Sequence, residues 1–506
     1  MRILIILLSL IANSITAQAA VNDSAPADYW FNRPEFQKLL DEQTHSKAYE
    51  KNQVKLLVNG AASYAQRKIN IKSANVILIK TFEFLDDEIG NEIVDLLLEK
   101  AKQGAKVFVQ YDVKGNYDTY SDLSKIVRGK KNPIPPHLQR FVKGSQGNGF
   151  LIPTSIPFSL FETLPFYHVP NNHEKYLITW DYKGPVKVIM GGLNTSAHDA
   201  LSGAKDAHGN PIPVPFYISK GFKGVEALAF RDTDVEVIGT VTQDIVKEYI
   251  RSAEYHLNNQ NIYFKKHILA SVQKAIEELK KVQESMIANA ASAFPENVGT
   301  AFVRFIATPP HQDDKEWNIV RMLVLMMQNI PKGSTVWMTA SQIVPTPEIQ
   351  NALLAAAKRG VKFEILGNPT VGADPVLTNI AMATRCRFRH LLTQFPKDSV
   401  SFYEWQGNYV EGVGRLMHQK IDAFGADENA PFSVGSSNLD AHSLKWNSED
   451  LLLIQSRELK KEFNAILKHD FSEPNSRKVT EEQLKKDDLI DKFHQCLFDW
   501  VFHSVI

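Results

Sequence analysis

Two distant stretches of the chain share one pattern of hydrophobic positions. Each begins with a short apolar run of strand type, continues with apolar residues at helical spacing, and ends in a second apolar run. The first stretch has these segments at residues 76–79, 89–102 and 107–109. The second stretch has them at residues 336–338, 347–358 and 361–366. Each stretch is therefore predicted to form a strand, a helix and a second strand.

The two predicted helices are also expected to end alike. Gly104 follows the first helix and Gly360 the second, and glycine commonly stops a helix because it accepts a left-handed conformation. Around these glycines, residues 101–107 align with residues 357–363 without a gap. A strand–helix–strand unit implies parallel pairing with the helix outside the sheet. The pattern therefore predicts an α/β fold built from an internal repeat.

The repeat divides the chain into two expected lobes. Since the chain has 506 residues, more than one structural unit is expected. We predict an N-terminal lobe over residues 20–255 and a C-terminal lobe over residues 301–506. Residues 256–300 would connect them, because the segment 266–293 has the Lys, Glu, Gln and Ala content of a helix. The lobes are expected to be related by a pseudo-twofold axis, each with a mixed, largely parallel sheet flanked by helices.

The first 19 residues are expected to be a secretory signal peptide. Arg2 precedes an apolar run that is interrupted only by Ser9, and residues 17–19 (Ala-Gln-Ala) then offer a cleavage site. The apolar run has about ten residues, whereas a bilayer span needs about twenty, so a membrane anchor is the weaker interpretation. The protein is therefore expected to be secreted or periplasmic.

The C-terminal tail carries an apolar stripe at helical spacing. We expect a tail helix that docks on the protein's own core, with attachment to a membrane surface as the alternative. The stripe consists of Leu489, Ile490, Phe493, Leu497, Trp500 and Val501.

Composition and charge exclude some classes of protein. An apolar fraction of 44% and a charged fraction of 23% are those of a globular protein rather than a disordered chain. The 57 basic and 57 acidic residues cancel, which argues against a protein that coats nucleic acid. The only two cysteines, Cys386 and Cys496, allow at most one internal disulfide.

Candidate chemistry lies at matched positions of the two halves. The first half contains His173 and Lys175, and the second contains His418 and Lys420, in each case two residues apart. Residues i and i+2 of a strand point to the same face. Each histidine is therefore expected to lie beside its lysine.

A glycine-containing turn and a carboxylate follow each histidine–lysine pair. The turns end in Asn194 and Asn438, and the carboxylates are Asp232 and Glu449. Lysines and asparagines could hold phosphate oxygens, while one histidine attacks phosphorus and the other protonates the leaving oxygen. A carboxylate behind each imidazole would fix its tautomer. The set predicts a phosphodiester-cleaving site without metal or other cofactor, since no His, Cys or Asp cluster has convincing metal-ligand spacing.

These residues resemble the phospholipase D superfamily, whose H-x-K-x4-D signature occurs twice, each time followed by a G-[GS]-x-N turn. Residues 191–194 and 231–239 are similar to the first motif of bacterial cardiolipin synthases and its continuation. Residues 435–444 resemble the continuation of the second motif, and residues 402–405 fit the same family. The resemblance covers residues 76–467, which is most of the chain.

The resemblance implies one site between the two lobes and a covalent phosphohistidine intermediate, which water or an alcohol releases. By matched position His173 would be the nucleophile and His418 the general acid, and the near equivalence of the half-sites leaves the reverse order open. The resemblance also implies that phosphate is bound by Lys175, Lys420, Asn194 and Asn438, and that the histidines are supported by Asp232 and Glu449.

The chain departs from the family signature at its aspartates. The signature places them at positions 180 and 425, where this chain has Trp180 and Gly425. Asp181 lies one residue late and Asp427 two residues late, and a one-residue shift on a strand turns a side chain to the other face unless a bulge restores it. Because this aspartate supports the site and does not attack phosphorus, its loss need not abolish the chemistry.

The sequence favours an exported phospholipase D-type enzyme that cleaves a phospholipid head-group phosphodiester. The alternative is a cardiolipin synthase-type phosphatidyltransferase, in which a lipid hydroxyl replaces water as the acceptor. Hydrolysis is preferred because no later segment has the length and apolarity of the transmembrane helices that many synthases carry. The further alternatives are a secreted nuclease, against which the zero net charge weighs, and a non-catalytic family member.

The expected partners are a phospholipid substrate and, transiently, a membrane surface, whereas nucleic acid is not expected. The sequence specifies neither the head group nor the oligomeric state.

Overall fold

The computed structural model describes residues 26, 28–117, 122, 125–126, 130–155, 171–214, 224–258, 268–309, 317–370 and 375–486. The predicted signal peptide and the apolar stripe of the tail lie outside these ranges.

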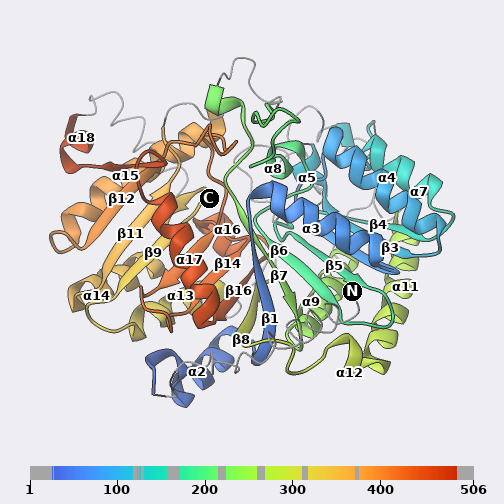
Figure 1. Cartoon of the computed structure of the whole chain (residues 1–506), viewed down its shortest axis with the longest axis horizontal. Coiled ribbons are helices and arrows are strands. Elements are labelled where there is room, and N and C mark those ends of the chain that lie inside the picture. Colours follow the sequence, from blue (N-terminus) through green and yellow to red (C-terminus); the bar gives the residue numbers. More distant parts are fainter. Residues whose placement is uncertain are drawn as a thin grey trace, which may run out of the picture.

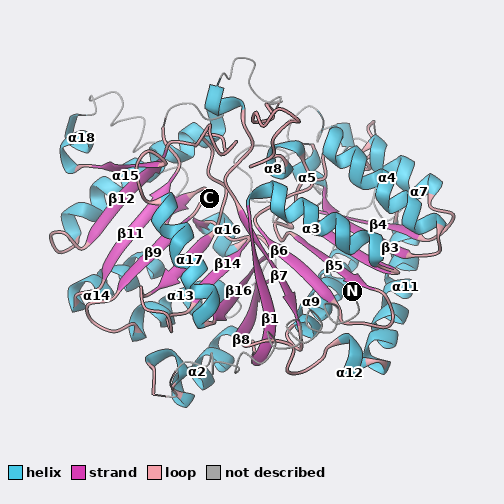
Figure 2. Cartoon of the chain, viewed as in Figure 1, coloured by secondary structure: helices cyan, strands magenta, loops and turns pink. Residues whose placement is uncertain are grey.

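In the described residues, fifteen strands form one mixed sheet that crosses the whole molecule (Figures 1 and 2). The strand order is β17-β12-β11-β9-β13-β14-β16-β8-β1-β7-β6-β5-β2-β3-β4. The strands of the first half are β1 (Ala48–Val58), β2 (Val76–Thr81), β3 (Lys106–Asp112), β4 (Gly149–Thr154), β5 (Tyr176–Trp180), β6 (Lys187–Gly191) and β7 (Thr233–Ile238). Those of the second half are β8 (Ala301–Thr308), β9 (Thr335–Thr339), β11 (Lys362–Gly367), β12 (Val400–Trp405), β13 (Ile421–Phe424), β14 (Phe432–Gly435), β16 (Glu449–Gln455) and β17 (Ser476–Val479). A separate parallel pair joins β10 (Ile343–Val344) to β15 (Leu439–Asp440).

Helices cover both faces of the sheet, with α3 and α17 in front and α9 and α11 behind in the view of Figure 1. The first half has η1 (Trp30–Asn32), α2 (Pro34–Thr44), α3 (Asn59–Ser73), α4 (Glu88–Lys102), α5 (Val113–Asn116), α7 (Pro136–Gly144), α8 (Ala197–Ala200), η3 (Gly224–Ala227) and α9 (Thr242–Asn258). The helices α11 (Leu269–Ala288) and α12 (Ala290–Ala293) fall in the predicted connector. The second half has α13 (Asn318–Asn329), α14 (Pro347–Arg359), α15 (Pro375–Gln394), α16 (Ala441–Lys445), α17 (Arg457–Asp470) and α18 (Glu481–Lys486).

The two predicted strand–helix–strand units are confirmed. They are β2–α4–β3 and β9–α14–β11, and the strands of each unit pair in parallel. Asp87 caps the start of α4 by accepting a hydrogen bond from the Gly90 amide at 2.8 Å. Gly104 and Gly360 follow the helices with φ of +93° and +100°. Both glycines therefore have the left-handed conformation that was expected at the ends of these helices.

The prediction of a largely parallel sheet is wrong. Parallel pairing is confined to β2–β3–β4 and β9–β11–β12, and every other neighbouring pair in the sheet of the described residues is antiparallel. The reason is local, because short connections such as the one between β5 and β6 allow only antiparallel neighbours.

The two halves share one sheet and are not separate sheets. The strand β1 of the first half pairs antiparallel with β8 of the second half at the centre. Read outward from this pair, the order β7-β6-β5-β2-β3-β4 on one side matches β16-β14-β13-β9-β11-β12 on the other in both chain order and direction. The pseudo-twofold relation of the halves and the exact lobe boundaries stay predictions.

Two further findings bear on the expectations from the sequence. Among the helices in the described ranges, none combines the length and the apolar character needed to cross a bilayer. Cys386 of α15 is buried and takes part in a disulfide.

Candidate active site

The predicted site residues gather at one edge of the sheet, where β5, β7, β13 and β16 begin. His173 and Lys175 lie directly before β5, and His418 and Lys420 lie directly before β13. Both pairs were expected inside strands, and that expectation is wrong. Each lysine turns its Nζ back to donate a hydrogen bond to the carbonyl of its own histidine. The ammonium groups are therefore held at the histidines by local backbone geometry.

The side-chain pairing of the site crosses between the two halves. His173 Nδ1 lies 2.8 Å from Glu449 Oε1, and His418 Nδ1 lies 2.8 Å from Asp232 Oδ2. Each histidine thus uses the carboxylate of the opposite half. The sequence predicted which four residues form the pairs, but it did not reveal which carboxylate serves which histidine.

Backbone contacts reinforce this crossing. The His173 amide donates to the carbonyl of Ser448, the residue before Glu449, at 3.1 Å. The His418 amide donates to the carbonyl of Arg231, the residue before Asp232, at 2.7 Å. Neither half can therefore assemble one histidine–carboxylate pair by itself.

The two carboxylates are fixed by different neighbours. Glu449 Oε2 accepts a hydrogen bond from Ser436 Oγ at 2.6 Å, and Asp232 Oδ1 accepts one from the Thr233 amide at 2.7 Å. Gly192 occupies the position in the first turn that Ser436 occupies in the second. A Cβ at Gly192 would lie 2.3 and 2.4 Å from the Asp232 carboxylate oxygens. The missing side chain is what allows Asp232 to reach His418.

We expect Gly192→Ala to reduce activity by about 10²-fold, because a shift of about 1 Å in a catalytic group can cost that much. The added methyl group must displace Asp232 or the turn. Gly184→Ala is the matched control, since a Cβ there meets nothing closer than Asp181 Oδ1 at 3.5 Å. Steady-state kinetics of both variants check this expectation, and equal activity would contradict it.

Burial and charge set the protonation of the site. Burial, together with Lys175 and Lys420, holds the pKa of His173 well below its usual value, and burial and Lys420 do the same for His418. Burial raises the pKa of Glu449 to about 7, against the attraction of Lys175. Burial also lowers the pKa of Lys420 to about 8, although Asp232 opposes this change. Both imidazoles are therefore neutral at neutral pH when no substrate is bound.

The two predicted asparagines lie in the same region. Both are buried at the ends of their turns. Asn194 Oδ1 accepts a hydrogen bond from the Glu83 amide at 3.2 Å, whereas Asn438 Oδ1 is buried without a hydrogen-bond partner in the described residues. Their role in binding phosphate stays a prediction.

The shifted aspartates do not replace the missing ones. Trp180 is buried and donates through Nε1 to the Gly184 carbonyl at 3.1 Å, while Asp181 accepts from the Lys183 and Gly184 amides in the turn after β5. Asp427 accepts from the Tyr29 hydroxyl at 2.9 Å. Both aspartates thus have structural partners of their own.

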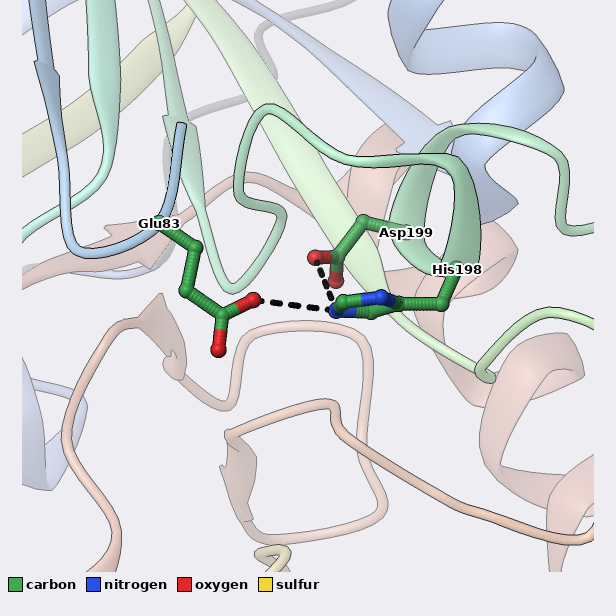
Figure 3. A group of neighbouring side chains, drawn as sticks. All are labelled: Glu83, His198 and Asp199. Carbon is green, nitrogen blue, oxygen red and sulfur yellow. Dashed lines mark hydrogen bonds and ion pairs between the residues drawn. The ribbon is translucent and has the colours of Figure 1, made fainter. Parts of the chain in front are cut away.

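Three residues near the site were not selected from the sequence. The side chains of Glu83, His198 and Asp199 converge (Figure 3). They lie beside His418, since Asp199 Oδ1 is 3.7 Å from His418 Nδ1. Burial opposes a charge on His198, but Asp199 and Glu83 raise its pKa to about 9. Because His198 has no second copy in the repeat, its sequence context favours an ordinary surface or packing role, with a place in a pocket near the first motif as the alternative. Its position four residues after Asn194 could have indicated that His198 lies near the site.

Comparisons with known proteins indicate which proteins this chain resembles. Residues 326–471 match a family model described as "Cardiolipin synthase, PLD-like domain". A cardiolipin synthase of Halalkalibacterium halodurans is 26% identical over 396 residues, which are 78% of this chain and 61% of the relative. Cardiolipin synthase A of Pseudomonas entomophila is 24% identical over 438 residues, which are 85% of this chain and 70% of the relative. The chain thus spans less than two thirds of the first of these relatives.

A solved structure agrees on the fold. The phosphatidylserine synthase of Haemophilus influenzae Rd KW20 covers 93% of this chain and 100% of its own, with a TM-score of 0.59 and 13% identity. At that identity the likeness concerns the fold alone.

The family model over residues 326–471 and the two relatives confirm the resemblance to the phospholipase D superfamily that the doubled His-x-Lys motif indicated. Within that superfamily, the relatives named above are cardiolipin synthases. The comparisons therefore favour the phosphatidyltransferase alternative over the exported hydrolase that the sequence placed first.

Proposed function

We propose that this protein is a phosphatidyltransferase of the cardiolipin synthase type, which moves a phosphatidyl group from a phospholipid to the hydroxyl of a second lipid. The observation that carries the proposal is the crossed pair of half-sites. Two neutral imidazoles are each backed by a carboxylate, with two ammonium groups beside them. The names of the sequence relatives support the transferase over the hydrolase.

The reaction proceeds in two displacements at phosphorus. In the first, His173 Nε2 attacks, the bond between phosphorus and the head-group oxygen breaks, and His418 in its protonated form gives a proton to the departing alcohol. In the second, the acceptor hydroxyl attacks phosphorus and gives its proton to His418, and the bond from phosphorus to His173 breaks. The sum exchanges one alcohol for another, so no other reactant is needed.

The charges of the site support this sequence of steps. The phosphodiester brings a negative charge beside Lys175 and Lys420. This charge raises the pKa of His418, so that the imidazole can carry the proton that it must donate. Glu449 accepts from His173 Nδ1, which directs the lone pair of Nε2 toward the substrate. The positive charge on the imidazole of the intermediate then faces the Glu449 carboxylate.

Limited access of water supports transfer over hydrolysis. The His173 side chain is 11% exposed and that of His418 is 16% exposed. Histidines that are this little exposed favour an acceptor that is held in place over bulk water. We retain, also as a proposal, the export signal and the use of a lipid surface as the source of substrate.

To test the proposal, the purified protein is given vesicles of phosphatidylglycerol, vesicles of phosphatidylcholine or single-stranded DNA, and the products are measured. We expect phosphatidylglycerol to yield a lipid with two phosphatidyl groups and free glycerol in equal amounts. Phosphatidic acid as the main product would instead restore the hydrolase, and cleavage of DNA alone would indicate a nuclease. A variant with both His173 and His418 changed to alanine controls for contaminating activity, and a wild type no more active than this variant would favour a non-catalytic member of the family.

A further inference from the structure

A second cluster of metal-ligand type lies beside the phosphodiester site. His198 Nε2 is 3.0 Å from Glu83 Oε2 and 3.4 Å from Asp199 Oδ2. One ligand atom from each of the three residues lies within 4.8 Å of the others. In Figure 3 the two carboxylates approach the same ring nitrogen of His198 from different sides.

These spacings fit the coordination of a small divalent ion. Bonds of about 2.1 Å at tetrahedral or octahedral angles place neighbouring ligand atoms about 3.0–3.4 Å apart. One imidazole nitrogen with two carboxylate oxygens is a donor set that suits Mn²⁺ or Zn²⁺. Three protein ligands also leave positions open for a small molecule or an oxygen of the substrate.

Backbone contacts hold the two ligand-bearing segments together. The Leu85 amide donates to the Thr195 carbonyl at 3.0 Å, and the Thr195 amide donates to the Glu83 carbonyl at 3.0 Å. Ser196 Oγ donates to Asp199 Oδ2 at 2.8 Å. The three ligands are therefore positioned by the fold and not by a flexible surface.

A buried oxygen without a hydrogen bond belongs to one of the three ligand residues. Asp199 is fully buried, and its Oδ2 faces His198, whereas its Oδ1 lies 3.7 Å from His418 Nδ1 and has no hydrogen-bond partner in the described residues. Leaving such an oxygen unsatisfied is costly unless a cation neutralises it. The side chain of Glu83 is 15% exposed, which gives an ion a route to the cluster.

We propose that Glu83, His198 and Asp199 bind a divalent cation of the Mn²⁺ or Zn²⁺ type next to the phosphodiester site. Asp199 is shared, since its second oxygen faces His418. The bound ion would replace the proton on His198 Nε2 and add positive charge beside the incoming phosphate. Linear spacing does not reveal this site, because Glu83 lies more than a hundred residues before the other two ligands.

Mn²⁺ binding to the full chain tests the proposal directly. The protein is stripped with a chelator, desalted and titrated with Mn²⁺, and free Mn²⁺ is followed by its electron paramagnetic resonance signal. We expect one site per chain, from which Zn²⁺ displaces Mn²⁺. Glu83→Gln and His198→Gln should each weaken binding by about tenfold or more.

His469→Gln is the matched control. His469 is also flanked by two carboxylates, but Asp470 meets its Nδ1 at 2.8 Å and Glu411 meets its Nε2 at 2.9 Å, so the two cannot converge on one ion with one ring nitrogen. This variant should bind Mn²⁺ as the wild type does. The proposal fails if the wild type holds no stoichiometric Mn²⁺, or if Glu83→Gln binds it unchanged. The Glu83 variant decides alone if His198→Gln does not fold, because Glu83 is the most exposed of the three ligands.

Discussion

Replacing His418 with alanine is expected to lower turnover of a phospholipid donor by about 10³-fold, while leaving formation of the covalent intermediate intact for an activated donor. A nitrophenyl ester of phosphatidic acid has a leaving group that needs no proton. His173 can therefore attack it without His418, but the acceptor then lacks a base and the intermediate accumulates. The expected observation is a burst of one nitrophenolate per chain, with a phosphatidyl group on His173 by mass spectrometry.

The surroundings of the two histidines give the physical reason for assigning the acid role to His418 and the nucleophile role to His173. His418 Nδ1 has Asp232 at 2.8 Å and Asp199 at 3.7 Å. Burial and Lys420 hold the pKa of His418 low in the free protein, but these two carboxylates favour the protonated imidazole of a general acid once a phosphodiester is bound. Burial and the two lysines also lower the pKa of His173, which has one carboxylate neighbour in the described residues, Glu449, and so favours the neutral, nucleophilic form.

His173→Ala is the control for the same experiment, and it should give neither burst nor turnover. His137→Ala adds a second control, because it removes another largely buried histidine that lies outside the site. A burst in His173→Ala and none in His418→Ala would exchange the two roles. A full turnover rate in either variant would contradict the phosphohistidine mechanism altogether.

The periodicity of the chain was enough to predict the elements that frame the site. The segments 76–79, 89–102 and 107–109 became β2, α4 and β3, because local hydrophobic spacing and a glycine stop determine such units. The parallel or antiparallel pairing of the strands could not be predicted in the same way. It depends on the lengths of connections around β5, β6 and β7, which the strand-like segments alone do not specify.

Within the site, too, the features set by local sequence could be predicted, whereas those set by long-range contacts could not. His173 and Lys175 could be found because their spacing is local and recurs at His418. The crossed pairing of His173 with Glu449 could not be found, since it depends on how β5 and β16 are brought together through the central β1–β8 pair. Glu83 was missed for the same reason, as no repeat or short motif connects it to Asp199.

Replacing Glu449 with glutamine is expected to lower kcat/KM by about 10³-fold. The amide keeps the size of the side chain but carries no charge, so the imidazole of the phosphohistidine loses its counter-ion. The amide can also turn its NH₂ group toward Nδ1, which places the histidine proton on Nε2, where the lone pair must attack. His173 stays in place, so the loss should fall on the chemical step more than on lipid binding.

The pH dependence of kcat/KM distinguishes this role from a structural one. The pKa of Glu449 is raised to about 7 by burial, so the carboxylate is protonated below that pH and activity of the wild type should rise as pH increases through about 7. The pKa of Lys420 is lowered to about 8 by burial, so its positive charge is lost and activity should fall as pH increases through about 8. Glu449→Gln should lack the acidic limb and keep the alkaline one.

A matched variant separates loss of this charge from loss of any glutamate bound to a histidine. Glu411 Oε1 lies 2.9 Å from His469 Nε2 and, in the described residues, contacts neither His173 nor His418, so Glu411→Gln should keep both the rate and the shape of the wild-type profile. An acidic limb that persists unchanged in Glu449→Gln would assign that limb to another group. An unchanged kcat/KM would remove Glu449 from the mechanism, and the crossed pairing would then serve only to join the two halves of the sheet.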